Sequence, residues 1–557
     1  MSAQVKFKSV NKLLQNSFKA NWNRPALSNY EGGTFTYGEL ATKIELLHMG
    51  FEKCGLRQGD KVAICGRNSA NWAVSLLAAI TYGAVAVPIL HEFKAGNIHY
   101  LVNHSEARVL FVDDVVWENL SEEEMPGLLV IVGLGDLKYI YSKSEEMTRI
   151  RDGIFRAFLR KHPCRLRPED LDYYEDGSEE LALINYTSGT SGYSKGVMLP
   201  YRALYANLYA ARNVAEPQMD NTSRMVAMLP SAHMYGLLFE LLYEMTIGAH
   251  THFLTRVPSP KVILKAFREI HPALIIAVPL IIEKVYKMQL KPILDRTKTF
   301  RKIPVLGQAI EYKLRSELVK AFGGEFEEVI LGGAPFNPEV ENFLHHIHFP
   351  YTVGYGMTEC GPLITYEKWS KLPKGSCGKP IPGCELRVDS PNPRKIEGEV
   401  QVRGCNLFLG YYKNDAENSK CFTPDGWFRT GDMGVVDSRG YLYLRGRSKC
   451  MILGASGQNI YPEELEAVLN NVSYVVDSLV IEDKGGLTAL IYPDYPQGAS
   501  DGLAKDALEK RLLDELPEIN KLLPAYAQIR KIEFMPEDFE RTPKRSIKRY
   551  LYLRNKD

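Results

Sequence analysis

The residues most able to do chemistry lie in the run 186–196, which reads YTSGTSGYSKG and follows the apolar segment 181–184. Its glycines let backbone N–H groups approach anionic oxygens, its hydroxyl side chains donate further hydrogen bonds, and Lys195 adds a positive charge. The spacing differs from the Walker pattern G-x-x-x-x-G-K-[ST]. A surface linker is the alternative, but linkers rarely follow an apolar strand and end in Ser-Lys-Gly. The run therefore predicts a strand followed by a polyphosphate-binding loop.

A carboxylate suited to magnesium follows a second glycine-containing turn. Glu359 comes directly after the segment 354–358, which reads GYGMT. Carboxylate oxygens are hard ligands of the kind preferred by the Mg²⁺ that accompanies ATP. Taken alone, Thr358 and Glu359 would be an ordinary helix N-cap. Together with a polyphosphate loop, the metal role is the favoured interpretation.

Four segments together resemble the signatures of a known superfamily. They are 187–196, 354–359, 427–432 and 446–449. In this order and spacing they are similar to the signatures of the adenylate-forming (AMP-binding) superfamily, which contains acyl-CoA synthetases, peptide-synthetase adenylation domains and luciferases. The resemblance covers almost the whole chain, and within the superfamily it points to the bacterial long-chain fatty acid–CoA ligases.

The resemblance implies where ATP and Mg²⁺ bind. The phosphates are expected at Thr187, Ser188, Gly189, Thr190, Ser191, Lys195 and Thr358. The adenine ring is expected against two turns, formed by Gly333, Ala334 and Pro335 and by Tyr355, Gly356 and Met357. Asp432 would accept the ribose hydroxyls, Arg447 would contact the nucleotide, and Glu359 would bind the metal. Thr190 and Glu359 are the implied catalytic residues, together with one lysine considered below.

The acyl-binding residues implied by the resemblance are His233, Tyr235 and Gly332. The segment 229–236 resembles the one whose His-x-Tyr side chains border the acyl pocket, although a lone histidine in an apolar setting is as readily structural. The segment 278–286 resembles the long-chain branch but has Leu280 where that branch has arginine. A long-chain fatty acid is therefore the expected acid, and the departure bears on chain length alone.

The C-terminal segment 541–550 departs further from the pattern of the superfamily. The family usually places a lysine there that contacts the carboxylate and the α-phosphate, and aligning Ile547 and Arg549 on that motif puts Ser546 at the lysine position. A serine carries no charge. In an extended segment residues 544, 546 and 548 share one face, so Lys544 or Lys548 is expected to substitute, with Lys544 preferred. The alternative is a chain in which adenylation is slow or lost.

The elements that position these residues follow from pattern and resemblance. Apolar runs at 61–66, 83–88 and 109–113 predict buried strands, and 72–82 predicts a helix between two of them. This α/β alternation suits layered sheets and helices. The resemblance implies a large N-terminal domain over 1–447, with a β-rich, barrel-like subdomain at about 380–445 and the phosphate loop at 187–196. A small mobile lid is expected over 448–557, with Lys449 as its hinge, and 457–466 is expected near the thiol acceptor, coenzyme A.

Composition narrows the alternatives. The chain has 557 residues, which is more than one hydrophobic core usually holds, and a net charge of +1, which argues against bulk nucleic-acid binding. Nine scattered cysteines indicate reduced thiols, and neither a signal peptide nor a transmembrane segment is expected. We expect a cytoplasmic protein.

An amphipathic segment at 149–167 stands apart from these motifs. Its apolar residues form one helical face, and arginines fill much of the rest: the apolar members are Ile150, Ile154, Phe155, Phe158 and Leu159. Such a helix suits contact with anionic lipid on the inner face of a membrane. The favoured alternative is a helix docked on the protein with a solvated basic face.

The expected activity has two steps. A fatty acid carboxylate and Mg·ATP give acyl-adenylate and pyrophosphate, and then a thiol, that of CoA, displaces AMP. Positioning and charge neutralisation suffice for the first step. The alternatives are a ligase that loads an acyl-carrier protein docked on 149–167, and a binder of nucleotide or acyl groups that lacks catalysis. A phosphate-loop kinase is disfavoured by the loop spacing.

Overall fold

The computed structural model of the chain describes residues 5–187, 194–213, 219–256, 259–297, 299, 303–453, 458–483, 486–542 and 546–554. The predicted loop residues Ser188, Gly189, Thr190 and Ser191 and the predicted lysine Lys544 lie outside these residues.

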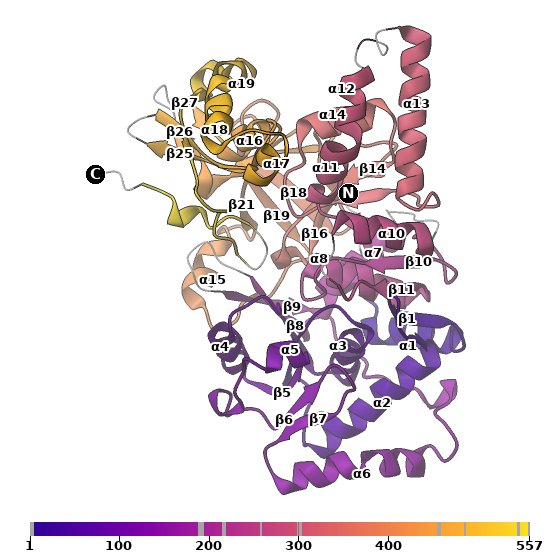
Figure 1. Cartoon of the computed structure of the whole chain (residues 1–557). Helices are drawn as coiled ribbons and strands as arrows, with labels where there is room; N and C mark the ends of the chain where they lie inside the picture. Colours follow the sequence, from indigo (N-terminus) through magenta and orange to yellow (C-terminus); the bar gives the residue numbers. More distant parts are fainter. Residues whose placement is uncertain are drawn as a thin grey trace.

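The largest sheet has eight strands in the order β20-β9-β8-β4-β3-β5-β6-β7 (Figure 1). Strands β3 to β6 and β8 run parallel to one another, whereas β7 is antiparallel to β6, β9 is antiparallel to β8, and β20 is antiparallel to β9. The bounds are β3 Lys61–Cys65, β4 Val85–Ile89, β5 Ala107–Val112, β6 Val130–Gly133, β7 Tyr139–Ser142, β8 Leu181–Thr187, β9 Lys195–Pro200 and β20 Gly410–Tyr411. The strands predicted near 61, 85 and 110 are confirmed. Their nearly continuous burial is typical of parallel strands covered on both faces.

Helix α3 (Ala70–Tyr82) is the predicted helix between β3 and β4, and it packs on both strands. It begins where the Ser69 side chain accepts a hydrogen bond from the Trp72 N–H at 3.1 Å. It ends at Gly83, whose φ of 82° is left-handed and favours glycine. Buried Trp72 fixes this helix in the core of the large domain. Helix α2 (Tyr37–Lys53) packs against α3, and α4 (Ala95–Ser105) packs on β4 and β5.

Two smaller sheets stand beside the large one. One has the order β10-β11-β1-β2 and the other is the parallel sheet β12-β13-β14. Their bounds are β10 Arg224–Ala227, β11 His250–Phe253, β1 Pro25–Asn29, β2 Thr34–Thr36, β12 Ile275–Ala277, β13 Val329–Leu331 and β14 Tyr351–Val353. The parallel sheet shares one buried apolar cluster with the helices that flank it. These are α10 Pro260–Ile270, α11 Pro279–Val285, α12 Lys291–Thr297, α13 Pro304–Ala321 and α14 Pro338–His346, with the π-helical turn η4 Tyr286–Leu290.

The β-rich region expected at 380–445 contains an antiparallel sheet in the order β18-β19-β21-β22. A second small sheet, β15-β16-β17, precedes it in sequence. The bounds are β15 Tyr355–Gly356, β16 Leu363–Tyr366, β17 Lys379–Pro380, β18 Cys384–Asp389, β19 Gly398–Gly404, β21 Phe428–Val436 and β22 Leu442–Arg447. Strand β22 leads directly into the C-terminal part of the chain.

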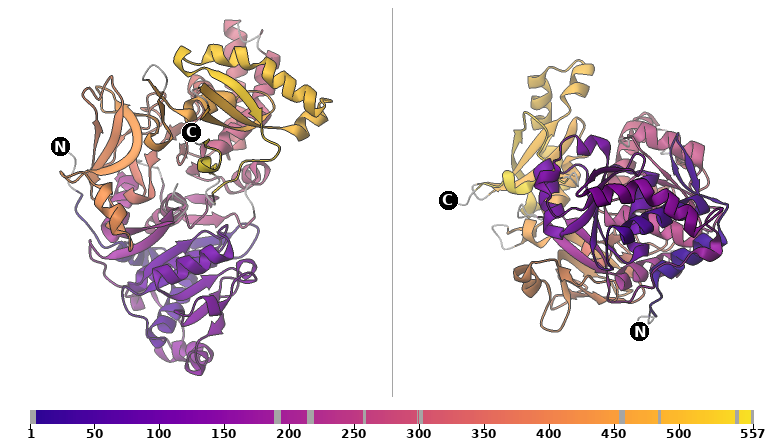
Figure 2. Two further views of the ribbon diagram at one scale, coloured as in Figure 1. Left: turned by 90° about the vertical axis from the view of Figure 1, so that its left-hand side faces the viewer. Right: turned by 90° about the horizontal axis from the view of Figure 1, so that it is seen from below.

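The C-terminal part, called the lid here and covering the described residues from 448 onward, has its own apolar core. Its sheet has the order β25-β26-β27, and helices cover one face of it (Figures 1 and 2). The bounds are β25 Val475–Asp483, β26 Gly486–Pro493, β27 Ile529–Phe534, α16 Pro462–Leu469, α18 Lys505–Asp514 and α19 Leu516–Leu522.

Polar contacts join the lid to the large domain. Asn337 donates from its amide to Asn471 Oδ1 at 2.5 Å, and Lys287 Nζ donates to the Val475 carbonyl at 2.9 Å. Asn459 also donates to Glu397 at 2.9 Å. Figure 1 shows the lid next to the helices α11 to α14, and the left-hand view of Figure 2 shows it next to the β-rich region.

The amphipathic segment forms α6 (Glu145–Lys161), at the end of the molecule opposite the lid (Figure 1). Phe158 is buried, and Ile150 and Ile154 pack half-buried against the large core, so much of the apolar face is covered by protein. Phe155 and Leu159 are exposed. Within the described residues no helix has both the length and the apolar character needed to cross a bilayer.

Candidate active site

A cavity of about 1970 Å³ lies between the large domain and the lid. It brings together predicted residues from every motif: Thr187, Lys195, His233, Tyr235, Gly332, Gly333, Ala334, Tyr355, Gly356, Met357, Thr358, Glu359, Arg447 and Lys449. Two of the predicted site residues that the structure describes do not line the cavity. Pro335 is exposed, and Asp432 is buried directly behind the wall.

The described ends of the predicted phosphate loop are adjacent strands. Thr187, the last residue of β8, is the antiparallel partner of Lys195, the first residue of β9. This register places the threonine hydroxyl and the ammonium group at the same edge of the sheet. The strand predicted before the Gly/Ser/Thr run is therefore present as β8. The two described ends of the run, Thr187 and Lys195, both line the cavity.

Glu359 sits on the 3-10 turn η6 (Thr358–Cys360) with its carboxylate nearly buried. Tyr411 donates a hydrogen bond from its hydroxyl to Glu359 Oε1 at 2.9 Å, which fixes the carboxylate. The backbone before it needs glycine, because a Cβ at Gly356 would stand 2.2 Å from the Pro362 carbonyl oxygen. No cluster of three or more acidic, His or Cys residues that would hold a metal occurs in the described part of the chain. A single carboxylate such as Glu359 suits a Mg²⁺ that ATP carries.

Asp432 is held on both carboxylate oxygens. Tyr355 donates to Oδ2 at 2.6 Å, and the Arg447 guanidinium pairs with Oδ1 at 2.7 Å. Burial raises the pKa of Asp432, while the Arg447 charge opposes that shift. Burial, together with the Asp432 charge, also raises the pKa of Tyr355. The three side chains join β15, β21 and β22 at the cavity: Tyr355 and Arg447 line it, and Asp432 lies behind them.

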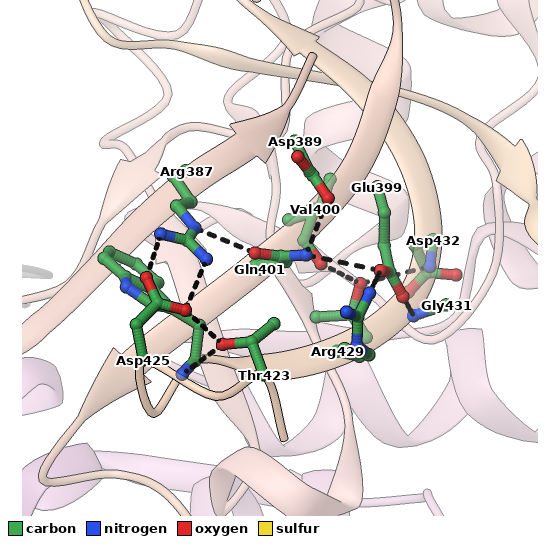
Figure 3. Close-up of polar contacts among 12 residues, drawn as sticks. Arg387, Asp389, Glu399, Val400, Gln401, Thr423, Asp425, Arg429, Gly431 and Asp432 are labelled. Atoms are coloured by element: carbon green, nitrogen blue, oxygen red, sulfur yellow. Dashed lines mark hydrogen bonds and ion pairs between the residues drawn. The ribbon is translucent and has the colours of Figure 1, made fainter. Parts of the chain in front are cut away.

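The backbone around Asp432 is fixed by the β-rich sheet (Figure 3). Glu399 on β19 accepts hydrogen bonds from the Arg429 guanidinium at 2.9 Å and from the Gly431 N–H at 3.2 Å. Thr430 donates to the Val400 carbonyl at 2.7 Å, and its hydroxyl accepts from the Asp432 N–H. Arg429, Thr430 and Gly431 are thus bonded to β19, and these contacts fix the backbone that carries Asp432.

Tyr235 and Gly332 meet on the other side of the cavity. Tyr235 donates to the Ile330 carbonyl at 3.0 Å, and a Cβ at Gly332 would lie 3.2 Å from the tyrosine ring. His233 precedes the short helix α8 (Met234–Leu237) and also lines the cavity. Apolar side chains continue the wall from here: Met228, Leu229, Phe239, Tyr243, Leu254, Ile263, Leu274, Ile276, Val278 and Ile281.

The C-terminal segment reaches the same cavity. Ser546, Lys548 and Arg549 line it, but both charged groups are paired within the lid: Lys548 with Glu540, and Arg549 with Glu466. Ser546 offers a hydroxyl and no charge. Lys544, which the sequence favoured as the substitute lysine, is outside the described residues.

Sequence reasoning missed Tyr411 and Glu417, which both line the cavity. Tyr411 holds Glu359, and Glu417 forms an ion pair with Lys195. Glu417 lies three residues after Asn414, which caps the short helix α15 (Asp415–Cys421). That spacing marks a helix start but carries no sign of function, since it occurs at many helix N-termini.

Two family descriptions match the sequence. The one for the AMP-binding enzyme matches residues 14–412, and the one for the AMP-binding enzyme C-terminal domain matches residues 450–555.

Curated proteins are similar over most of the chain. Long-chain-fatty-acid–CoA ligase FadD15 of Mycobacterium bovis is 28% identical over 569 residues, covering 92% of this chain and 89% of that protein. Long-chain-fatty-acid–CoA ligase 1 of Saccharomyces cerevisiae is 26% identical, covering 84% of this chain and 73% of that protein.

Solved structures share the fold. ATP-bound MatB from Rhodopseudomonas palustris superposes with a TM-score of 0.76 at 22% identity, with 98% of each chain covered. MenE from Bacillus subtilis in complex with ATP and magnesium gives a TM-score of 0.73 at 22% identity, covering 97% of this chain and 98% of that one. The predicted α/β fold with a large N-terminal and a small C-terminal domain is confirmed.

Proposed function

The chain belongs to the AMP-binding enzymes of the adenylate-forming superfamily, and on that basis we propose that it activates a long-chain fatty acid with Mg·ATP and transfers the acyl group to coenzyme A. The reaction class, an AMP-forming ligation of an acid to a thiol, follows from the family. The chain length of the acid, the acceptor and the role of each residue are the proposal.

One observation supports the long acyl chain: the cavity that Thr187, Lys195 and Glu359 line is also lined by the apolar side chains named above. Burial of each methylene contributes about 0.8 kcal/mol, so an apolar wall of this extent favours long chains strongly over short ones. The names of the similar curated proteins agree with this choice.

The first step joins the fatty acid carboxylate to the α-phosphorus of ATP, and pyrophosphate leaves. Mg²⁺, where bound, would neutralise charge on the phosphates, and Glu359 would hold it. Lys195 and the hydroxyls of the loop orient the polyphosphate, while Asp432 orients the ribose. This chain therefore contributes positioning and fixed charges rather than a covalent intermediate.

The second step needs a different arrangement of the lid. The CoA thiol attacks the acyl carbonyl of the adenylate, and AMP leaves. Lys449 lies at the start of the lid, two residues after β22 ends, and lines the cavity, so rotation there would change which lid residues face the substrate. Lys449 is thus our proposed hinge, with the large domain at 1–447 and the lid at 448–557.

The test is pyrophosphate release with Mg·ATP across carboxylic acids of graded length, with and without CoA. The expected result is release that depends on a long-chain acid, with AMP and acyl-CoA as co-products. A Lys195→Ala variant is the control for contaminating activity. Release that is independent of any acid, or formation of ADP instead of AMP, would refute the proposal.

Two further candidates each rest on one observation. Ser546 in place of a lysine favours a nucleotide or acyl binder, which predicts ATP binding without pyrophosphate release. An acyl-carrier protein as acceptor is favoured by the exposed basic face of α6 (Glu145–Lys161), and it predicts acyl transfer to carrier protein when CoA is omitted.

Contact of α6 with an anionic membrane surface stays a hypothesis, as does location in the cytoplasm. Exposed Phe155 and Leu159 support the membrane contact. The packing of Phe158, Ile150 and Ile154 on the protein leaves a smaller apolar face for it than the sequence pattern suggested.

A further inference from the structure

Lys195, the proposed phosphate-binding lysine, is held by a carboxylate far away in sequence. Its ammonium group forms an ion pair with Glu417, and the two side chains are 20% and 38% exposed. The pair is thus partly shielded from water, so it is stronger than a fully exposed pair.

The same lysine touches the side chain that holds Glu359. Lys195 Nζ lies 5.1 Å from the centre of the Tyr411 ring, and the Tyr411 hydroxyl donates to Glu359 Oε1 at 2.9 Å. A cation over an aromatic face is attracted to it. A continuous line of contacts therefore runs from Glu417 through Lys195 and Tyr411 to the proposed metal ligand.

Glu417 is fixed in place by the fold. The Asn414 side chain accepts a hydrogen bond from the Glu417 N–H at 3.2 Å, and so caps α15. Asn418, on the same helix, accepts from the Tyr411 N–H at 2.7 Å and donates to the Tyr411 carbonyl at 2.9 Å. Tyr411 lies on β20, which pairs with β9, and Lys195 is the first residue of β9. Both partners of the ion pair are therefore anchored to the same two strands.

Charges from three directions act on the Glu417 carboxylate. The hydrogen bond from Lys195 is the largest cause of its lowered pKa, and the charges of Lys449 and Lys420 add to it. Lys195 begins β9, Lys420 lies on α15 itself, and Lys449 is the proposed hinge. Glu417 thus interacts with three ammonium groups, and Lys195 is the one with which it forms an ion pair.

We propose that Glu417 is a positioning residue, which holds the Lys195 ammonium group in the orientation that receives the β- and γ-phosphates of ATP. The inference rests on the proposed function in that it takes Lys195, at a described end of the predicted loop, as a contact of these phosphates. A lysine has three N–H donors, so Lys195 keeps donors for a phosphate while one is held by Glu417. The benefit is pre-organisation, because the long lysine side chain is ordered before ATP arrives.

The variants Glu417→Ala and Glu417→Gln separate position from charge. Both remove the negative charge, but glutamine keeps an oxygen that accepts a hydrogen bond from Lys195. We expect Glu417→Ala to lower kcat/KM for ATP in pyrophosphate release by about tenfold, and Glu417→Gln to retain at least about half the activity. Formation of acyl-CoA from synthetic palmitoyl-adenylate should be unchanged in both, since that substrate lacks the β- and γ-phosphates.

Three results would overturn the inference. If both variants changed kcat/KM equally, charge rather than position would be the cause. Equal losses in the two half-reactions would indicate a structural defect. A loss in Lys195→Ala/Glu417→Ala that equalled the product of the two single losses would show that Glu417 acts independently of Lys195. Asp415→Asn is the matched control, because it also removes a carboxylate charge, at an exposed position of the same short helix. Its kcat/KM for ATP should equal that of the wild type.

Calorimetric measurement of Mg·ATP binding tests the role of Glu417 independently of the proposed ligase activity. If the wild type released no pyrophosphate with any acid, the activity proposal would fail while the inference could still be measured. Glu417→Ala should then bind Mg·ATP about tenfold more weakly than Glu417→Gln, with equal affinities for AMP. Equal Mg·ATP affinities of the two variants would refute the inference.

Discussion

The hydroxyl of Tyr355 donates a hydrogen bond of 2.6 Å to the carboxylate of Asp432, 77 residues later in the chain. With Arg447 on the other oxygen, Asp432 has a protein partner on each side. A carboxylate oxygen has two lone pairs, so each oxygen retains the capacity to accept a ribose hydroxyl. Tyr355 and Arg447 thus orient the Asp432 carboxylate and still leave lone pairs on both of its oxygens.

Asp432→Asn should weaken AMP binding. Hydrogen bonds to a charged group contribute about 1.5–3 kcal/mol, so the dissociation constant is expected to rise by at least about tenfold. Tyr355→Phe leaves the carboxylate and its Arg447 partner in place and should cost less, about threefold. Calorimetric titration with AMP measures both. Wild-type affinity in Asp432→Asn would show that the ribose binds elsewhere.

Glu359→Gln should weaken the binding of the Mg²⁺ that the first step requires. An amide oxygen is a weaker ligand for Mg²⁺ than a carboxylate, and we expect pyrophosphate release to fall by about 100-fold or more. The Mg²⁺ concentration for half-maximal rate should rise, whereas AMP binding in the absence of metal should stay unchanged. Tyr411→Phe, which removes only the hydrogen bond to Glu359, is the milder companion variant. A normal Mg²⁺ response in Glu359→Gln would exclude Glu359 as the metal ligand.

The lysine that serves adenylation is expected to be Lys544. Lys544→Ala should reduce pyrophosphate release by at least about tenfold and leave acyl transfer from a synthetic adenylate intact. Lys548→Ala should have little effect because Glu540 already holds that ammonium group. Ser546→Lys should raise the rate of the first step. Impaired release in Lys548→Ala, with normal release in Lys544→Ala, would reverse the assignment.

Stability should fall with rising pH because of one buried carboxyl. Burial raises the pKa of Glu328 to about 7 from an ordinary 4.5, against the lowering effect of hydrogen bonds from Tyr366 and the Trp369 N–H. The folded state therefore binds a proton that the unfolded state releases between these values. Its contribution, up to about 3 kcal/mol, is fully present below pH 4.5 and is lost as the pH rises through 7.

Thermal unfolding at a series of pH values between 4.5 and 8 tests this prediction. Glu328→Gln cannot ionise, so its stability should depend less on pH over that range and exceed the wild type at pH 8. Glu327→Gln, which alters a neighbouring and more exposed carboxylate that pairs with Lys368, should keep the wild-type slope. Identical slopes in all three proteins would show that Glu328 is ionised in the folded state.

Filling the apolar wall should shorten the preferred acid. Ala211 is buried on α7 (Tyr201–Asn213) and lines the cavity, so Ala211→Phe places a ring in the proposed acyl site. Loss of room for even two methylenes corresponds to about 1.6 kcal/mol, so kcat/KM for a 16-carbon acid should fall by about tenfold or more relative to an 8-carbon acid. An unchanged ratio would place the acyl chain elsewhere in the cavity.

The sequence predicted best what depends on neighbours in the chain. Strands such as β3 and the helix α3 follow from local apolar pattern and capping, and contiguous segments suffice to propose site roles for Thr358, Glu359 and Asp432. Glu417 and Tyr411 were missed because their meaning depends on partners 222 and 52 residues away. The local sequence of a glutamate in a capped helix is the same whether or not the glutamate pairs with a lysine from a distant strand.

The apolar wall shows the same limit. Tyr235 and Gly332 were both expected at the acyl site, but the side chains that continue the wall come from several strands and helices whose packing no single pattern encodes. Ile263 and Ile276 look like ordinary core residues in the sequence, and they become cavity residues only through the arrangement of α10 and β12.

The separate core of the lid bears on the energetics of its movement. Within the described residues, its buried apolar cluster is drawn entirely from the lid, and the joints to the large domain named above are amide and ammonium hydrogen bonds. Such bonds exchange readily with water at little net free energy. A reorientation of the lid that keeps its core intact would therefore expose little new apolar surface and carry a small heat-capacity change. The two orientations would then lie close in free energy, and the bound ligand, rather than the protein's own packing, would select between them.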